Sequence, residues 1–197
     1  MKKLIFIMMV LFLSGCGWMY ELGGSSSEGY EFEGSMPEFT FTDHNNEAFG
    51  TEQLEGQYYL ANMIFTYCAT VCPTMTPNMQ RLQETLEGDG VELQFVSFTV
   101  DPVRDTPDHL KQYGSNVGAN LETWHFLSGY EIEEMAALSN EAFSAIVQED
   151  KENDDIIHST QFYLINKEGQ VIRKYSGLQP NQEPIIEDIK RSIENEL

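Results

Sequence analysis

Three side chains in this sequence combine soft-metal binding with thiol redox chemistry: Cys68, Cys72 and His158. The two cysteines stand four residues apart, which places both thiols on one side of a first helical turn, where they can close a disulfide or hold one metal ion. The CxxxC loop gives the sulfurs a wider bite than CxxC and suits a soft metal of low coordination number. Taken alone, the pair fits a structural disulfide in an oxidising compartment as well as it fits a metal site.

The segments on either side of the cysteines predict where they lie in a fold. Residues 58–67 form a nearly continuous apolar run, typical of a strand buried on both faces, and Pro73 begins a predicted helix that ends near Leu86. A second buried strand follows at residues 93–100, so the unit is βαβ. Cys68 thus lies where a parallel strand ends and a helix begins, a place where backbone N–H groups and the helix dipole favour a thiolate.

Further elements extend this unit along the chain. They are a hairpin at 39–42 and 48–49, a helix from Thr106, a strand at 124–127, a helix at 132–143, a hairpin at 160–165 and 171–175, and a helix from Pro184. Their order predicts an α/β protein with a thioredoxin fold, an N-terminal β-hairpin extension, and an inserted strand and helix.

The predicted fold indicates where His158 lies relative to the two cysteines. In a thioredoxin fold the turn before the strand equivalent to residues 161–165 packs over the dithiol, and Ile157–Thr160 occupies this turn here. We therefore expect His158 to face both sulfurs. Two thiolates and one imidazole suit Cu(II), and the thiolates alone can hold Cu(I).

The other candidate ligands have weaker grounds. His44, His109 and His125 lack such a placement and are not expected to bind metal. Met75 and Met79 carry soft thioether sulfurs on the helix after the dithiol, where core packing is the expected role.

The N-terminus predicts export and a lipid anchor. Residues 1–15 have two lysines, a short apolar run and the ending Leu13-Ser14-Gly15, as in a signal peptide, and Cys16 follows directly as in a bacterial lipobox. An ordinary secretory signal with an incidental cysteine is the alternative. We expect a lipidated Cys16, a flexible Gly/Ser/Glu-rich tether over residues 16–35, and one domain over residues 36–197 on the outer face of the cell membrane.

Charge narrows the range of partners. The formal net charge is −21, which excludes binding to nucleic acid or to anionic lipid by charge. With Cys16 assigned to the anchor, Cys68 and Cys72 remain as an even pair.

Three motifs together resemble the Sco/SenC family of copper proteins. They are residues 65–73 (FTYCATVCP), residues 100–107 (VDPVRDTP) and His158-Ser159 before a strand. In the first, Ala69 and Thr70 replace the proline and acid that often follow the first cysteine in this family. The resemblance implies Cys68, Cys72 and His158 as copper ligands, a Cys68–Cys72 disulfide after oxidation, and delivery of copper to the dinuclear CuA centre of cytochrome c oxidase subunit II. We also expect a monomer.

Other functions share the same residues. A thiol-disulfide oxidoreductase that reduces the oxidase cysteines would need Cys68 and Cys72 but not His158. A thiol peroxidase and a redox or copper sensor are further alternatives. Asp101, Arg104 and Asp105 lie next to the expected site, where an ion pair at a helix N-terminus and a role in docking or copper tuning are equally compatible with the sequence.

Overall fold

The computed structural model describes residues 29–153 and 155–195 of the 197. Its main sheet contains eight strands in the order β1-β10-β9-β4-β5-β6-β2-β3, and β7 and β8 pair separately. The strands are β1 Tyr30–Ser35, β2 Thr40–Asp43, β3 Ala48–Gly50, β4 Tyr59–Ile64, β5 Gln94–Thr99, β6 Trp124–Ser128, β7 Gln148–Asp150, β8 Asp155–Ile157, β9 Gln161–Ile165 and β10 Gln170–Ser176.

The middle of the sheet positions the dithiol. Strands β4, β5 and β6 are parallel, whereas β9 lies antiparallel to β4 on its other side. Every residue of β4 is buried, as its apolar run predicts for a strand covered on both faces. Strand β4 lies in the middle of the sheet and ends at Ile64. The segment that carries Cys68 follows directly, so the cysteine lies near the carboxyl end of a central strand.

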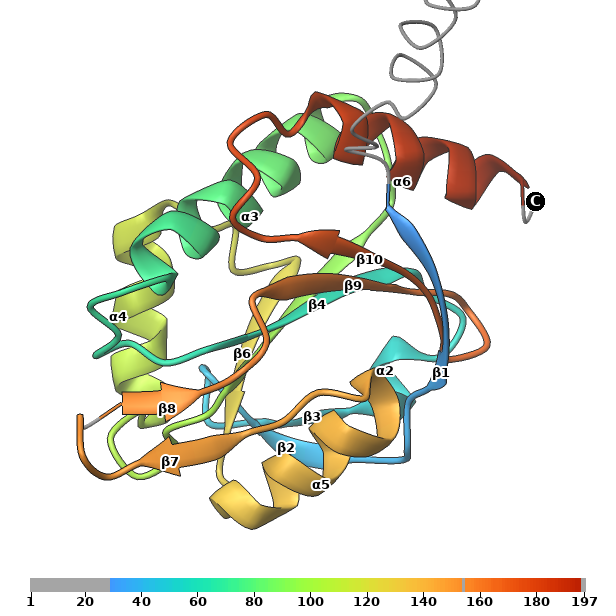
Figure 1. Cartoon of the computed structure of the whole chain (residues 1–197). Helices are drawn as coiled ribbons and strands as arrows, with labels where there is room; N and C mark the ends of the chain where they lie inside the picture. Colours follow the sequence, from blue (N-terminus) through green and yellow to red (C-terminus); the bar gives the residue numbers. More distant parts are fainter. Residues whose placement is uncertain (1–28, 154, 196–197) are drawn as a thin grey trace, which may run out of the picture.

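Helices cover both faces of the sheet (Figure 1), with α3 and α6 together on one side and α5 on the other. The helices are α2 Thr51–Leu54, α3 Cys72–Gly88, α4 Pro107–Val117, α5 Ile132–Phe143 and α6 Glu183–Asn195. On the α5 side, the ring of Phe143 stacks on Tyr163 of β9 at 4.1 Å between centroids. The α/β thioredoxin fold is confirmed, with the hairpin β2–β3 as its N-terminal extension and β6 and α5 as the inserted strand and helix.

Two strand pairs differ from the expectation. Residues 30–35, expected in the tether, form β1, which pairs with the edge strand β10. Tyr30 and Phe32 alternate with Glu31 and Glu33, a strand pattern that the Gly, Ser and Glu composition of the segment obscures. Strands β7 and β8 pair as a separate two-stranded hairpin, an element not predicted from the sequence.

The expected signal segment and Cys16 lie outside the described residues. Within the described part of the chain, no helix is long and apolar enough to cross a membrane.

Replacement of Met79 tests whether the helix after the dithiol is held by packing. Met75 and Met79 have no exposed surface and belong to the hydrophobic core. We expect Met79→Ala to lower the free energy of unfolding by about 2–5 kcal/mol through the cavity it leaves, measured by urea denaturation. Met79→Leu, which keeps the volume, is the control and should cost less than about 1.5 kcal/mol. Equal stabilities of the alanine and leucine variants would contradict the packing role.

Candidate metal and dithiol site

Cys68 and Cys72 meet at the N-terminus of α3. Cys72 is the first residue of this helix, and Cys68 lies in the preceding loop rather than in a helical turn. The backbone N–H of Cys72 donates to the Sγ atom of Cys68 at 3.4 Å, and the hydroxyl of Thr70 lies 3.4 Å from the same sulfur. Both cysteines are buried and reduced. The Cys68 sulfur therefore occupies a position where helix amides stabilise negative charge, as the sequence predicts.

A buried carboxylate holds the loop that precedes Cys68. Asp105 is fully buried and accepts hydrogen bonds from the backbone N–H of Thr66 at 3.1 Å and from its hydroxyl at 2.5 Å. The hydroxyl of Thr99, at the end of β5, donates to the same carboxylate at 2.5 Å. The Nε2 atom of His109 lies 2.8 Å from the Thr66 hydroxyl. Asp105 thus ties the ends of β4 and β5 together under the dithiol loop.

Asp101 and Arg104 form an ion pair in the same β5–α4 loop. The guanidinium of Arg104 also lies 5.1 Å from the centroid of the Tyr67 ring, next to Cys68. Of the three charged residues that the sequence singles out here, two pair with each other and the third, Asp105, supports the dithiol loop.

His158 lies beside Cys68, as expected from its place before β9. Its ring packs edge-on against Phe65 at 5.7 Å between centroids. The Nδ1 atom lies 2.9 Å from the carbonyl oxygen of Ser159, and because a carbonyl can only accept, the ring proton is assigned to Nδ1. The Nε2 atom is buried without a hydrogen bond of ordinary geometry. The Nε2 atom can bind a metal ion when it carries no proton and can donate to the Cys68 sulfur when it carries one, while the Ser159 carbonyl fixes a proton on Nδ1, as the backbone does in many metal-binding histidines.

The two thiols have opposite acidities. Burial raises the pKa of Cys68, but interactions of its sulfur with the side chains of His158 and Thr70 and with the amides of Cys72 and Thr70 outweigh burial and lower the pKa from 9.0 to about 5. Burial raises the pKa of Cys72 to about 12, and the nearby negative charges of Cys68 and Asp105 act in the same direction. At neutral pH Cys68 is a thiolate and Cys72 a thiol.

The three expected ligands are only partly brought together. His158 and Cys72 both interact with Cys68. However, among the described residues only Asp43, His44 and His125 place three such ligand atoms within 4.8 Å of one another. A copper ion held by both sulfurs and His158 would therefore need a small movement of the imidazole or of the dithiol loop.

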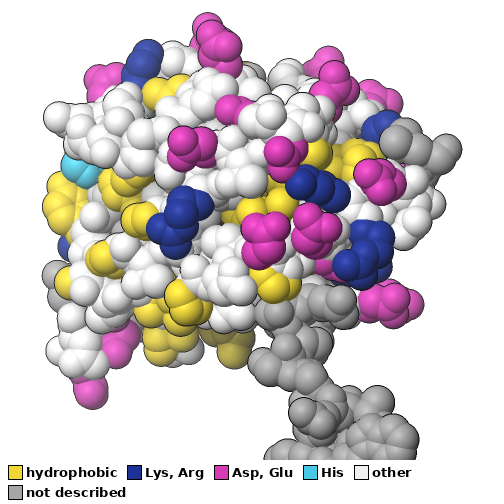
Figure 2. Space-filling model, turned by 90° about the horizontal axis from the view of Figure 1, so that it is seen from above, with side chains coloured by type: hydrophobic (Ala, Val, Ile, Leu, Met, Phe, Trp, Pro, Cys, Tyr) yellow, Lys and Arg dark blue, Asp and Glu magenta, His cyan; other side chains and the backbone are white. Residues whose placement is uncertain are grey.

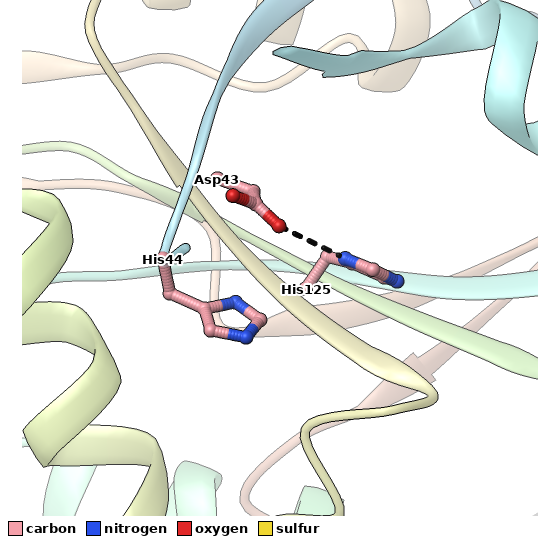
Figure 3. Close-up of side chains that lie close together, drawn as sticks. All are labelled: Asp43, His44 and His125. Carbon is pink, nitrogen blue, oxygen red and sulfur yellow. Dashed lines mark ion pairs between the residues drawn. The ribbon is translucent and has the colours of Figure 1, made fainter. Parts of the chain in front are cut away.

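The cluster of Asp43, His44 and His125 was not anticipated from the sequence. Asp43 Oδ2 lies 3.6 Å from His125 Nδ1 (Figure 3), and His44 follows β2. The Nδ1 atom of His44 accepts the N–H of Phe126 at 3.3 Å, so in the neutral ring the proton is on Nε2, which lies 3.2 Å from Asn45 Nδ2. Burial lowers the pKa of both histidines. We interpret the cluster as a structural tie between β2 and β6, in which the Asp43 carboxylate faces His125 and His44 accepts the N–H of Phe126.

A thioredoxin fold with a dithiol at the end of a central strand and a histidine facing the first sulfur defines a class of protein. It is a thioredoxin-like dithiol protein with a histidine beside the first sulfur.

Comparison with known proteins identifies the family within this class. A model of the SCO1/SenC family matches residues 28–194, and the chain belongs to this family. The SCO1 protein homolog of Bacillus subtilis (strain 168) is 34% identical over 181 residues, which are 91% of this chain and 90% of that protein.

Solved structures of relatives superpose well. A SCO1/SenC family lipoprotein from Bacillus anthracis str. Ames is 38% identical, with a TM-score of 0.78 over 82% of this chain and 96% of the other. BsSco, described as a cytochrome c oxidase assembly protein of the Sco family with a disulfide switch, is 34% identical, with a TM-score of 0.74 over 82% and 95%. Copper-bound ScoI of Bradyrhizobium japonicum is 26% identical, with a TM-score of 0.66 over 80% and 98%.

The acidity of Cys68 predicts the pH dependence of its alkylation. The rate of reaction with iodoacetamide, followed by mass spectrometry of the Cys68 peptide, should be half-maximal near pH 5 and constant above about pH 6, because the thiolate is the nucleophile. In His158→Ala the midpoint should move to higher pH. His125→Ala, a histidine remote from the sulfurs, serves as the control and should leave the midpoint in place. An unchanged midpoint in His158→Ala would show that the imidazole does not stabilise the thiolate.

Proposed function

We propose that this protein is a copper-binding assembly factor that prepares or supplies the dinuclear CuA centre of cytochrome c oxidase. The observation that carries the proposal is the arrangement of Cys68, Cys72 and His158, in which the buried Nε2 atom of the imidazole lies against the thiolate of Cys68. Copper-bound ScoI of Bradyrhizobium japonicum and the oxidase assembly role given for BsSco support it.

Cys68, Cys72 and His158 fit copper by the chemistry of their donor atoms. Copper(I) prefers soft thiolates in low coordination, which the two sulfurs supply, and copper(II) accepts imidazole as an additional ligand. Cys72 must lose its proton on binding, so copper affinity should fall as the pH falls. Met75 and Met79 are buried in the core, which favours packing over ligation.

Oxidation of the dithiol offers a way to end copper binding. If Cys68 and Cys72 together lose two electrons to an exported oxidant, along with the remaining thiol proton, they form a disulfide and no longer offer thiolate ligands. The disulfide switch described for BsSco supports such a reaction in this chain. We propose the Cys68–Cys72 disulfide as the oxidised state.

We propose that the protein acts as a monomer and that its partner is subunit II of the oxidase. The two proteins would bind each other at the outer face of the cell membrane. Residues 1–15 would be a signal peptide and Cys16 the lipidated anchor, as the lipobox predicts. The Bacillus anthracis relative is described as a lipoprotein, which supports the anchor. Because β1 begins at Tyr30, the tether proposed between Cys16 and the domain would be shorter than the sequence indicates.

A thiol-disulfide reductase is the second candidate, and the unequal acidities of the cysteines favour it. A thiolate at Cys68 with a pKa of about 5 can attack a disulfide at neutral pH, and Cys72 can resolve the mixed disulfide. This activity reduces the cysteines of the copper site and does not require His158 as a ligand.

Replacement of His158 separates the two candidates. Wild type and His158→Ala are titrated with Cu(II) while the thiolate-to-copper charge-transfer band is recorded, and oxidase activity is measured in cells that carry each variant. We expect wild type to bind one copper. His158→Ala should lose the band and at least about tenfold in affinity, because removing a direct ligand should cost no less than removing a residue that only supports one.

His125→Ala is the matched control, since His125 lies beside Asp43 rather than beside a sulfur, and it should keep the band. Oxidase maturation by His158→Ala without the copper band would reject the copper role in favour of the reductase.

A further inference from the structure

The loops around Cys68 form a surface without formal charge. Residues 65–73, 157–160 and 176–182 contain no Asp, Glu, Lys or Arg, although 22% of the chain is charged. They are neighbours in space, because the Phe65 ring packs on His158 and the N–H of Gly177 donates to the carbonyl of Thr160 at 2.8 Å. Together with residues 100–106 we call these loops the dithiol face.

Residues 100–106 form the one charged loop of this face, and they expose no unpaired charge. Asp101 and Arg104 pair with each other, and Asp105 is fully buried among hydroxyl donors. Charge elsewhere is plentiful, and the view in Figure 2 shows acidic side chains mainly over its upper and right parts, whereas its left edge carries hydrophobic side chains with a histidine.

Large hydrophobic side chains are exposed mainly on the dithiol face. Among the described residues, four of the five exposed large hydrophobic side chains lie on it: Tyr67, Val103, Ile157 and Leu178. Val103 is 84% exposed, although it belongs to the loop that Asp105 anchors. The fifth, Ile146, lies between α5 and β7 and is 68% exposed. Exposed apolar side chains that surround a reactive centre mark an interaction surface.

Tyr67 is held rigid although it is 55% exposed. Its ring stacks on His109 at 5.4 Å with an interplanar angle of 6°, and Arg104 lies over it at 5.1 Å. A rigid aromatic ring next to an arginine loses little entropy on binding, and Tyr and Arg are enriched where proteins bind proteins, whereas acidic residues are depleted there.

We propose that the dithiol face docks a protein domain whose own thiol-bearing copper site is bordered by an uncharged, apolar surface. The proposal rests on the function proposed above. Copper or disulfide exchange requires direct contact between sulfur atoms, and an uncharged border allows that contact without burying unpaired charges. The rest of this strongly acidic protein would repel an acidic partner, so the face also fixes the orientation. A membrane surface fits poorly, because interfacial surfaces are rich in Lys and Arg, and Arg104 is the only such residue on this face.

The test introduces one charge at three exposed positions. Val103→Glu and Leu178→Glu place a carboxylate on the dithiol face. Ile146→Glu is the matched control, because Ile146 lies outside this face and its exposure is between those of Val103 and Leu178. Binding of each full-length protein in detergent to the reduced, copper-free CuA domain of oxidase subunit II is measured by titration calorimetry. We expect Val103→Glu and Leu178→Glu to weaken binding at least tenfold, Ile146→Glu to change it less than twofold, and all three to keep the wild-type Cu(II) band.

Equal binding by the three variants, or no binding of the wild type, would overturn the proposal. The copper titration of His158→Ala is independent of these variants, so the proposed copper role can stand when the docking surface fails. Loss of binding to phosphatidylcholine vesicles in Val103→Glu and Leu178→Glu, with unchanged binding to the CuA domain, would assign the face to the membrane and would also overturn it.

Discussion

The buried carboxylate of Asp105 is the interaction on which the site depends. It accepts two hydrogen bonds from Thr66 and one from Thr99, and so joins the ends of two parallel strands beneath the loop that carries Cys68. A buried carboxylate is tolerated only when donors surround it, so the loop is held in the conformation that supplies those donors. This anchoring presents Cys68 to the N-terminus of α3 and leaves Val103 and Tyr67 at the surface.

The electrostatics of the dithiol follow from that placement. Cys68 receives amide and hydroxyl interactions and the imidazole of His158, whereas Cys72 is buried beside two negative charges. One thiolate is therefore ready at neutral pH, and the second requires a metal or an oxidant to displace its proton. The same asymmetry serves copper capture and thiol exchange, which explains why His158 is the residue that separates the two functions.

Local patterns predict part of this structure and long-range pairing decides the rest. The apolar run at residues 58–67 and the helix start at Pro73 are local signals, and both place Cys68 correctly. His158 could be placed only by analogy with a fold, and its distance from Cys72 depends on side-chain packing that no pattern encodes. The Asp43–His44–His125 cluster depends on the pairing of β2 with β6, which the sequence does not indicate, and β1 is obscured by its Gly/Ser/Glu context.

The central claim is that Cys68, Cys72 and His158 converge on one copper ion. X-ray absorption at the copper edge of the protein loaded with one Cu(II) measures the donor atoms directly. We expect two sulfur scatterers and at least one imidazole nitrogen, with loss of the imidazole signal in His158→Ala and loss of one sulfur in Cys72→Ser. A first shell with only nitrogen and oxygen, or one that is unchanged in both variants, would contradict it.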